Sequence, residues 1–295
     1  MQSFLSLVKN SKLAKSITSL ALGKFDGMHL GHQALFNALD ENGAILCIEA
    51  SDGTLLPKKY RKYFTHFPMF CLDLEIVRCK SDREFVGFLL GVLPNLKRIV
   101  VGYDFRFGKD RFYYPFDLSK CFNGEVVVVN EVSCKKLSIH SGLIKEMLLN
   151  GNVKQANKLL GRMYMVQGSI IKGQGLGKKA LYATINLQND GFLLPQDGVY
   201  AGFIQLGGCA MLEDSKEAQL YPAVIFIGNR LSTDKVFAIE GHLLGVSLEA
   251  TESEVRFYFC KKIRDNRKFE SLDLLKAQIS ADIESAYRIL KVSNG

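Results

Sequence analysis

The segment LGKFDGMHLGHQ, residues 22–33, decides the fold of the first half of the chain. It follows a short apolar run at residues 17–22 and leads into a stretch with helical character. Gly23, Gly27 and Gly31 allow the backbone to turn tightly and to approach a ligand closely. A strand, a glycine-rich turn and a helix in this order are typical of a phosphate-binding site at the carboxyl end of a parallel strand.

Two histidines in this segment are the candidate catalytic residues. His29 and His32 are three positions apart, so at a helix start they lie on one face, beside free backbone N–H groups. Their imidazoles can donate hydrogen bonds to phosphate oxygens as charge develops there, and can align an attacking phosphate with the α-phosphorus of ATP. The alternative is a pair of surface histidines that are satisfied at a helix cap.

The first half of the chain alternates between strands and helices. Strands are expected at residues 17–22, 44–49, 98–101 and 125–132, and helices at residues 82–90, 143–149 and 153–160. This alternation favours a parallel sheet with helices on its faces. The last two helices each end at a glycine, and we place the domain boundary after the second, Gly161.

The second half has a different pattern, with short apolar segments separated by Gly, Asn and Asp. Strands are expected at residues 166–171, 184–187, 199–206, 223–227, 236–244 and 254–259. Their spacing indicates a small antiparallel barrel. A final helix carries apolar residues at helical spacing from Leu272 to Leu290, with Ser271 as its cap, and this stripe is expected to pack on a core.

Composition excludes several classes of protein. The chain has 295 residues, 47% of them hydrophobic, which suffices for two cores, and no apolar stretch is long enough to span a bilayer. The seven cysteines include no Cys-x-x-Cys pair, which disfavours disulfide frameworks and zinc sites and favours a cytoplasmic protein. The net charge of +8 suits RNA or polyphosphate ligands. Basic clusters at residues 58–62 and 261–267 favour a solvated basic surface.

A second segment, VVGYDFRFGK at residues 100–109, also follows a strand. Together with the histidine segment it resembles the bacterial bifunctional riboflavin kinase/FMN adenylyltransferase family, also called FAD synthetase. The resemblance implies that the first domain has a nucleotidylyltransferase-like, Rossmann-like parallel sheet. It also implies two sets of binding residues. ATP phosphates would contact Gly23, Phe25, Asp26, Gly27 and Gly31, and flavin or nucleotide would contact Gly102, Asp104, Phe105, Phe107 and Gly108. The aromatic residues could instead be ordinary core.

The family's Ile-Ser-Ser-Thr-x-Ile-Arg stretch, whose hydroxyls and arginine hold phosphates, corresponds here to IHSGLIK at residues 139–145. Ser141 remains, and Lys145 takes the place of the cation. We expect a working but altered site, in which Lys145 or the pair Lys135 and Lys136 supplies the charge. The alternative is a riboflavin kinase with a degenerate first domain.

The segments YATINL, residues 182–187, and AIEGHLL, residues 238–244, resemble motifs in the kinase part of the same family. The resemblance implies that the nucleotide is bound by Thr184, by Asn186 and by the glycine-rich loop before them. It also implies that Thr184 and Asn186 hold Mg²⁺ and that Glu240 is the catalytic base. A carboxylate can accept the proton of the riboflavin 5′-hydroxyl as that oxygen attacks the γ-phosphorus. The implied ATP and flavin contacts are Gly173, Gly175, Gly177, Lys178, Thr184, Asn186, Tyr200 and Arg264. Arg264 could instead form a surface ion pair.

The expected protein is therefore a two-domain transferase, with the adenylyltransferase at residues 1–161 and the kinase, a small antiparallel barrel with a C-terminal helix, at residues 162–295. It would use Mg²⁺, with ATP, riboflavin, FMN and FAD as substrates or products. We expect no nucleic acid, membrane or obligatory protein partner. A basic RNA-binding protein and a transferase with another acceptor are the remaining alternatives.

Overall fold

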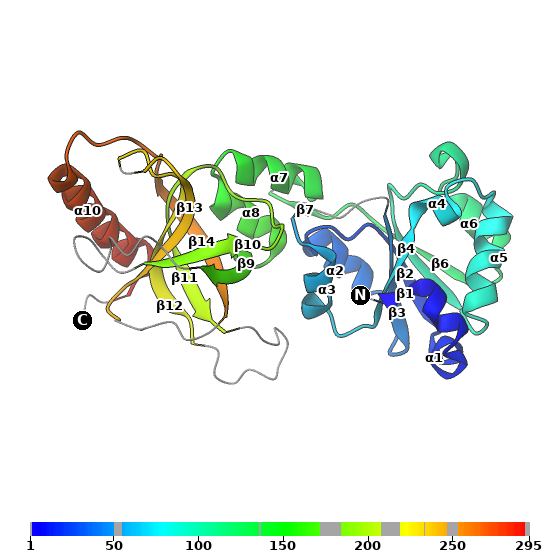
Figure 1. The fold of residues 1–295 in the computed structure, drawn as a ribbon. Coiled ribbons are helices and arrows are strands. Elements are labelled where there is room, and N and C mark those ends of the chain that lie inside the picture. The colour runs from blue at the N-terminus through cyan, green and yellow to red at the C-terminus, as the bar shows by residue number, and fades with distance from the viewer. Residues whose placement is uncertain are drawn as a thin grey trace. The chain divides into compact units, whose positions relative to one another are not determined.

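The computed structural model describes residues 2–49, 55–135, 137–171, 184–207, 219–232, 234–246 and 253–292. The chain divides into two compact units, residues 1–141 and 142–295, and both are drawn in Figure 1. Each unit has its own sheet and its own core. The expected order, α/β first and mostly β second, is confirmed.

The first unit is built on a six-stranded sheet in the order β1-β4-β3-β2-β5-β6, and every neighbouring pair is parallel. The strands are β1 (Gln2–Ser3), β2 (Ser19–Gly23), β3 (Gly43–Glu49), β4 (Met69–Asp73), β5 (Arg98–Gly102) and β6 (Glu125–Val129). The chain runs from β2 outward to β3 and β4, and then crosses to β5 on the other side of β2. The carboxyl ends of β2 and β5 thus form a topological switch point, where sheets of this kind bind ligands.

Helices cover both faces of this sheet, with α2 on one face and α1, α5 and α6 on the other (Figure 1). The helices are α1 (Ser11–Ser16), α2 (Leu30–Phe36), α3 (Lys58–Arg61), α4 (Leu74–Val77), α5 (Asp82–Val92) and α6 (Pro115–Cys121), with short 3-10 turns η1 (Phe4–Val8), η2 (Lys62–Phe64) and η3 (Lys109–Arg111). Ser81 and Glu84 form a capping box at the start of α5. The core between these layers includes Phe4 and Leu7, so these N-terminal residues belong to the fold.

The second unit contains a closed six-stranded antiparallel barrel in the order β10-β13-β12-β11-β14-β9. The strands are β9 (Tyr164–Ile171), β10 (Ile185–Asn189), β11 (Gly198–Leu206), β12 (Tyr221–Asn229), β13 (Phe237–Leu243) and β14 (Glu254–Arg264). Each of the six expected strands overlaps one of these, so the barrel is confirmed. Closure leaves no open sheet edge.

The helices α7 (Ser141–Leu149) and α8 (Val153–Leu160) group with the barrel and not with the sheet. The side chain of Asn157 on α8 bonds to the carbonyl of Phe259 on β14 at 2.8 Å and to the amide of Tyr164 on β9 at 2.7 Å. The compact units therefore divide near residue 141, before these helices, whereas the boundary expected from sequence lies at residue 161. The domain limits of the two activities stay a prediction.

The last helix, α10 (Leu272–Leu290), begins at its expected cap, where Ser271 Oγ accepts from the amide of Leu274 at 3.2 Å. It packs against β11 and β12 through Ala286 and its neighbours. The apolar stripe describes this helix incompletely, because Leu272 is 53% exposed and a carboxylate, Asp282, is buried in the middle of the helix.

Three of the four strands expected in the first half have close counterparts, while β6 ends at Val129 and not near residue 132. Strands β1 and β4, on one side of the sheet, were not expected. The first has two residues and the second has five, so neither carries a clear alternating pattern. A small antiparallel pair, β7 (Ser133–Cys134) and β8 (Leu137–Ser138), follows β6.

Candidate active sites

The glycine-rich turn between β2 and α2, residues 24–29, lies at the switch point of the sheet. It is held in an unusual backbone conformation, since Phe25 and Met28 have φ values of 53° and 48°, and Gly27 has 89°. Each non-glycine residue in the left-handed region costs on the order of 1–3 kcal/mol and persists only where its surroundings fix it. Gly23 is required by close approach, because a Cβ there would lie 2.9 Å from the Phe25 ring.

The two candidate histidines lie together at the start of α2. His29 is the N-cap, and its Nδ1 accepts from the amide of His32 at 3.4 Å. The two rings are stacked with centroids 3.6 Å apart, and the edge of the Phe25 ring packs against His32 at 5.2 Å. His29 is only 4% exposed, so the alternative of two surface histidines does not describe it.

Asp26 holds the turn in place. Its Oδ1 accepts from the amides of Leu55 and Leu56 at 3.1 and 3.2 Å, and the hydroxyl of Ser141 donates to the Asp26 carbonyl at 2.7 Å. Asp26 is 1% exposed. The carboxylate is therefore engaged with the neighbouring backbone, and its direct contact with ATP stays a prediction.

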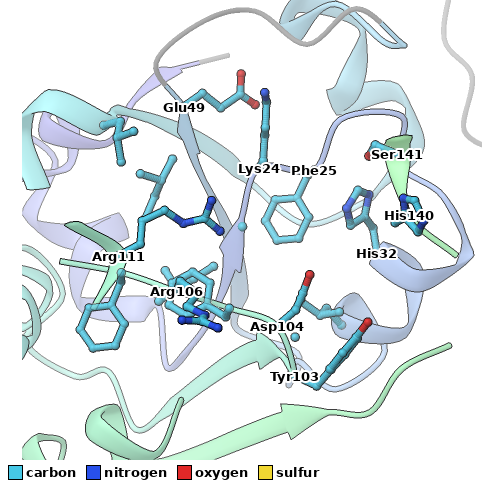
Figure 2. Close-up of a pocket in the computed structure, with 18 of the residues that line it drawn as sticks. Lys24, Phe25, His32, Glu49, Tyr103, Asp104, Arg106, Arg111, His140 and Ser141 are labelled. Atoms are coloured by element: carbon cyan, nitrogen blue, oxygen red, sulfur yellow. The ribbon is translucent and has the colours of Figure 1, made fainter. Parts of the chain in front are cut away.

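A pocket of about 970 Å³ opens beside the turn (Figure 2). The predicted residues that line it are Gly23, Phe25, His29, Gly31, His32, Gly102, Asp104, Phe105, Phe107, Gly108 and Ser141. They come from both sides of the switch point, as ligand binding between β2 and β5 requires. Asp26 and Gly27, which were also predicted, lie in the turn behind the pocket wall.

Sequence reasoning missed several charged residues of this pocket, among them Lys24, Glu49, Arg78, Arg106, Lys109, Arg111 and His140. Figure 2 shows His32, His140 and Ser141 along one side, with Arg106 and Arg111 across from them. Arg78 follows α4, and Lys109 and Arg111 belong to η3, so no regular spacing marks these residues in the sequence. The pocket lining holds five cations and four carboxylates, Glu49, Glu75, Asp104 and Asp110, and the cations suit a polyphosphate ligand.

The second predicted segment forms the wall beyond β5. Gly108 has a φ of 70°, and a Cβ there would lie 2.6 Å from the Lys80 carbonyl. Phe107 is 5% exposed and packs on Phe85, with ring centroids 5.0 Å apart. Much of the Phe107 ring therefore belongs to the hydrophobic core. Phe105 is only partly buried and offers an aromatic face to the pocket.

Neither Lys135 nor Lys145, two of the cations proposed to replace the family's arginine, is among the residues that line this pocket. Lys145 lies on α7, in the second unit, and Lys135 is exposed in the turn between β7 and β8. Lys136 lies outside the described residues. The contribution of each to phosphate binding stays a prediction.

The barrel brings together the second set of candidate residues. Asn186 on β10 lies directly opposite Glu240 on β13, so their side chains share one face of the barrel wall. Thr184 precedes β10 by one residue and lies on the same side of the strand as Asn186. The glycine-rich loop with Gly173, Gly175, Gly177 and Lys178 lies outside the described residues.

Glu240 is held by an arginine that sequence reasoning did not assign. Arg230 Nη1 lies 2.9 Å from Glu240 Oε1, and its Nη2 lies 2.8 Å from Asp234 Oδ2. Burial raises the pKa of Glu240, and the ion pair with Arg230 opposes that rise. The carboxylate is therefore partly shielded from water and oriented by a fixed cation.

Two residues that were predicted to contact a ligand, Tyr200 and Arg264, have bonding partners within the protein. Tyr200 is 0% exposed, its hydroxyl donates to the Gln196 carbonyl, and burial raises its pKa. Arg264 forms an ion pair with Asp282 on α10, with Nη2 2.8 Å from Oδ2. The ion-pair alternative thus describes Arg264, although its partner is buried. Arg264 connects β14 to α10, and the contact of either residue with ATP or flavin stays a prediction.

Comparisons with known proteins agree with this geometry. The family described as riboflavin kinase matches residues 160–290, and the family described as FAD synthetase matches residues 11–48. The bifunctional riboflavin kinase/FMN adenylyltransferase of Haemophilus influenzae is 30% identical over 91% of this chain and 92% of its own. The enzyme of the same name from Buchnera aphidicola of Schizaphis graminum is 29% identical over 94% of this chain and 95% of its own.

A crystal structure described as a macrolide-efflux protein from Streptococcus pneumoniae also matches, with a TM-score of 0.78 and 29% identity over 92% of this chain and 93% of that one. In the described part of this chain, no helix is both long and apolar enough to cross a membrane. With a switch-point pocket in one unit, a closed barrel in the other and these matches, the chain is a transferase. The chain belongs to the bifunctional riboflavin kinase/FMN adenylyltransferase family.

Proposed function

We propose that this chain phosphorylates riboflavin to FMN with ATP and then adenylylates FMN to FAD with release of pyrophosphate. The observation that carries the proposal is the presence of two separate sites on one chain, the histidine turn at the switch point and the Asn186–Glu240 face of the barrel. We assign adenylyl transfer to residues 1–161 and the kinase to residues 162–295. The matches to both family descriptions support this assignment.

In adenylyl transfer, an oxygen of the FMN phosphate attacks the α-phosphorus of ATP, and the bond from that phosphorus to the pyrophosphate oxygen breaks. The attacking phosphate is already ionised, so the site needs no strong base. His29 and His32 donate hydrogen bonds to phosphate oxygens in the transition state. The pocket walls after β2 and β5 hold the two substrates in line. Ser141 adds a hydroxyl to the phosphate site in this proposal, and Lys145 stays a predicted phosphate contact.

In the kinase reaction, Glu240 accepts the proton of the riboflavin 5′-hydroxyl while that oxygen attacks the γ-phosphorus and ADP leaves. Burial raises the pKa of Glu240, which makes it a better base than an exposed carboxylate. Arg230 keeps the carboxylate oriented at 2.9 Å.

The hydroxyl of Thr184 and the amide oxygen of Asn186 fit a magnesium ion, because Mg²⁺ prefers oxygen ligands and takes part of its shell from substrate phosphates. Asn186 lies opposite Glu240, and the alternation of side chains along a strand favours the same side for Thr184, two residues earlier. When bound, the ion would neutralise charge on the transferred phosphate. We place the enzyme in the cytoplasm, acting on small molecules without an obligatory partner.

The altered segment at residues 139–145 keeps one alternative open, a riboflavin kinase whose first domain makes no FAD. Site-specific variants separate the two possibilities. Glu240→Gln should abolish FMN formation from riboflavin and leave FAD formation from supplied FMN. His29→Ala/His32→Ala should do the reverse.

Matched controls are available for both variants. Glu284 is exposed on α10 and His66 is exposed after α3, so Glu284→Gln and His66→Ala should leave both rates unchanged. If folded Glu240→Gln protein lost both activities, the separation of the two sites would be wrong. If the wild-type chain made FMN but no FAD, the kinase-only alternative would replace the proposal.

A further inference from the structure

Arg61, the last residue of α3, is a charged side chain that is 0% exposed. Its Nη1 donates to the Lys24 carbonyl at 2.8 Å and also pairs with Glu49, and its Nε donates to the Leu56 carbonyl at 3.0 Å. The three partners belong to separate segments. Arg61 therefore joins the histidine turn, the end of β3 and the segment that leads into α3.

Its carboxylate partner, Glu49, is the last residue of β3 and has a side chain that is 1% exposed. Glu49 lies at the wall of the switch-point pocket, and Lys58 Nζ lies 3.6 Å from its Oε2. The nearby thiol of Cys47 adds no charge, since burial raises its pKa to about 12. Glu49 is thus a buried anion held between two cations, with Arg61 as its closest partner.

The histidine turn needs such a partner because its conformation is strained at Phe25 and Met28. Asp26 fixes the middle of the turn through the amides of Leu55 and Leu56. Arg61 fixes its start, because Lys24 immediately precedes the first strained residue. Residues 55–61 thus hold the turn at two successive points.

We propose that Glu49 and Arg61 are a positioning pair for adenylyl transfer, in which Arg61 fixes the start of the histidine turn through the Lys24 carbonyl and Glu49 orients the guanidinium. His29 and His32 follow the turn directly, so a shift of the turn moves both imidazoles away from the phosphates. Misplacement of reacting groups by about 1 Å can reduce a rate about a hundredfold. The inference rests on the proposed adenylyl transfer in the first unit.

The test compares Glu49→Gln with Glu49→Gln/Arg61→Met in the full-length chain. Glu49→Gln keeps the donor to Lys24. The double variant removes both buried charges, so that no unpaired charge is left, and replaces the guanidinium with an apolar side chain that cannot donate. Steady-state rates of FAD formation from FMN would be measured at varied ATP and FMN, well below the melting temperature. The rate of riboflavin phosphorylation by the same chain shows whether the barrel is folded and active.

We expect the kcat for FAD formation in the double variant to fall about 10- to 100-fold below that of Glu49→Gln, with riboflavin phosphorylation unchanged. A purely structural ion pair would lower the melting temperature and leave the kcat of the folded protein unchanged. The control is Arg98→Met, which breaks an exposed ion pair with Glu125 in the same sheet and should affect neither activity.

If the double variant folds and its kcat for FAD formation is within about twofold of Glu49→Gln, the positioning role is refuted. Arg61→Lys covers the case in which the double variant does not fold, because a single ammonium keeps a charge beside Glu49 but cannot serve three acceptors. Wild-type kinetics in folded Arg61→Lys would equally refute the role. A wild-type chain that makes no FAD would instead refute the proposed function.

Discussion

Replacing Asp282 with alanine should weaken the attachment of α10 to the barrel. The Asp282 carboxylate accepts from Arg264 Nε at 3.0 Å and Nη2 at 2.8 Å, and from Gln278 Nε2 at 2.9 Å. Its side chain is 3% exposed, whereas that of Arg264 is 19% exposed. The pair connects the end of β14 to the middle of the helix, so the substitution removes a long-range contact.

The expected loss of unfolding free energy follows from these exposed fractions. Removing one partner of a fully buried ion pair costs about 3–5 kcal/mol, because the other charge is left uncompensated. Arg264 is partly exposed and can still reach water, so we expect a smaller loss than for a fully buried pair, about 2–3 kcal/mol. For a unit of this size, such a loss corresponds to a fall in melting temperature of about 5–10 °C.

Calorimetry is the suitable assay, because the chain has no tryptophan to report on either unit by fluorescence. The thermal loss of riboflavin phosphorylation identifies the transition that belongs to the barrel. Glu284→Ala, an exposed carboxylate two residues further along α10, is the matched control. If Asp282→Ala melts within about 2 °C of Glu284→Ala, the reasoning is refuted, since a shift that small corresponds to less than about 1 kcal/mol.

Three further substitutions test the packing. Gly87→Ala on α5 should stabilise the first unit by about 0.5–1 kcal/mol in denaturant unfolding, because the new Cβ meets nothing within 4 Å and alanine is the better helix former. Gly241→Ala should destabilise the barrel by about 1–3 kcal/mol, since its Cβ would lie 2.2 Å from Ile204 Cδ1, and an unchanged midpoint would contradict this. Asp26→Ala should cost about 3 kcal/mol by leaving two backbone amides unpaired, and should reduce FAD formation but not FMN formation in a flavin product assay.

The features that sequence predicted well are local ones. The histidine turn was found because its glycines and histidines lie within one short segment, and the same segment occurs at the switch point of the sheet. The barrel strands were found because turn residues separate them at regular spacing. In both cases a few consecutive residues determine the conformation.

Arg61 could not have been found in this way. It lies in a run of basic residues, 58–62, which reads as a solvated surface, yet it is fully buried. Its burial depends on Glu49, 12 positions away, and on the Lys24 carbonyl, 37 positions away. Only the parallel pairing of β2 and β3 brings these groups to one end of the sheet.

The same limit applies to the charged residues of the barrel. Arg264 was expected to contact a ligand, and its partner Asp282 was concealed within an apolar helical stripe. Arg230 was not assigned, because its contact with Glu240 arises from the turn that joins β12 to β13. Charge pairing across strands leaves no periodic signal in the sequence, because each partner is set by register.

The central claim is that one chain carries both activities, and a flavin product assay tests it most directly. Purified protein would be incubated with MgATP and either riboflavin or FMN, and the flavins would be separated by chromatography. The account predicts FMN and FAD from riboflavin, and FAD from FMN. FMN alone from riboflavin, with no FAD from supplied FMN, would contradict the claim and leave the histidine turn without its proposed reaction.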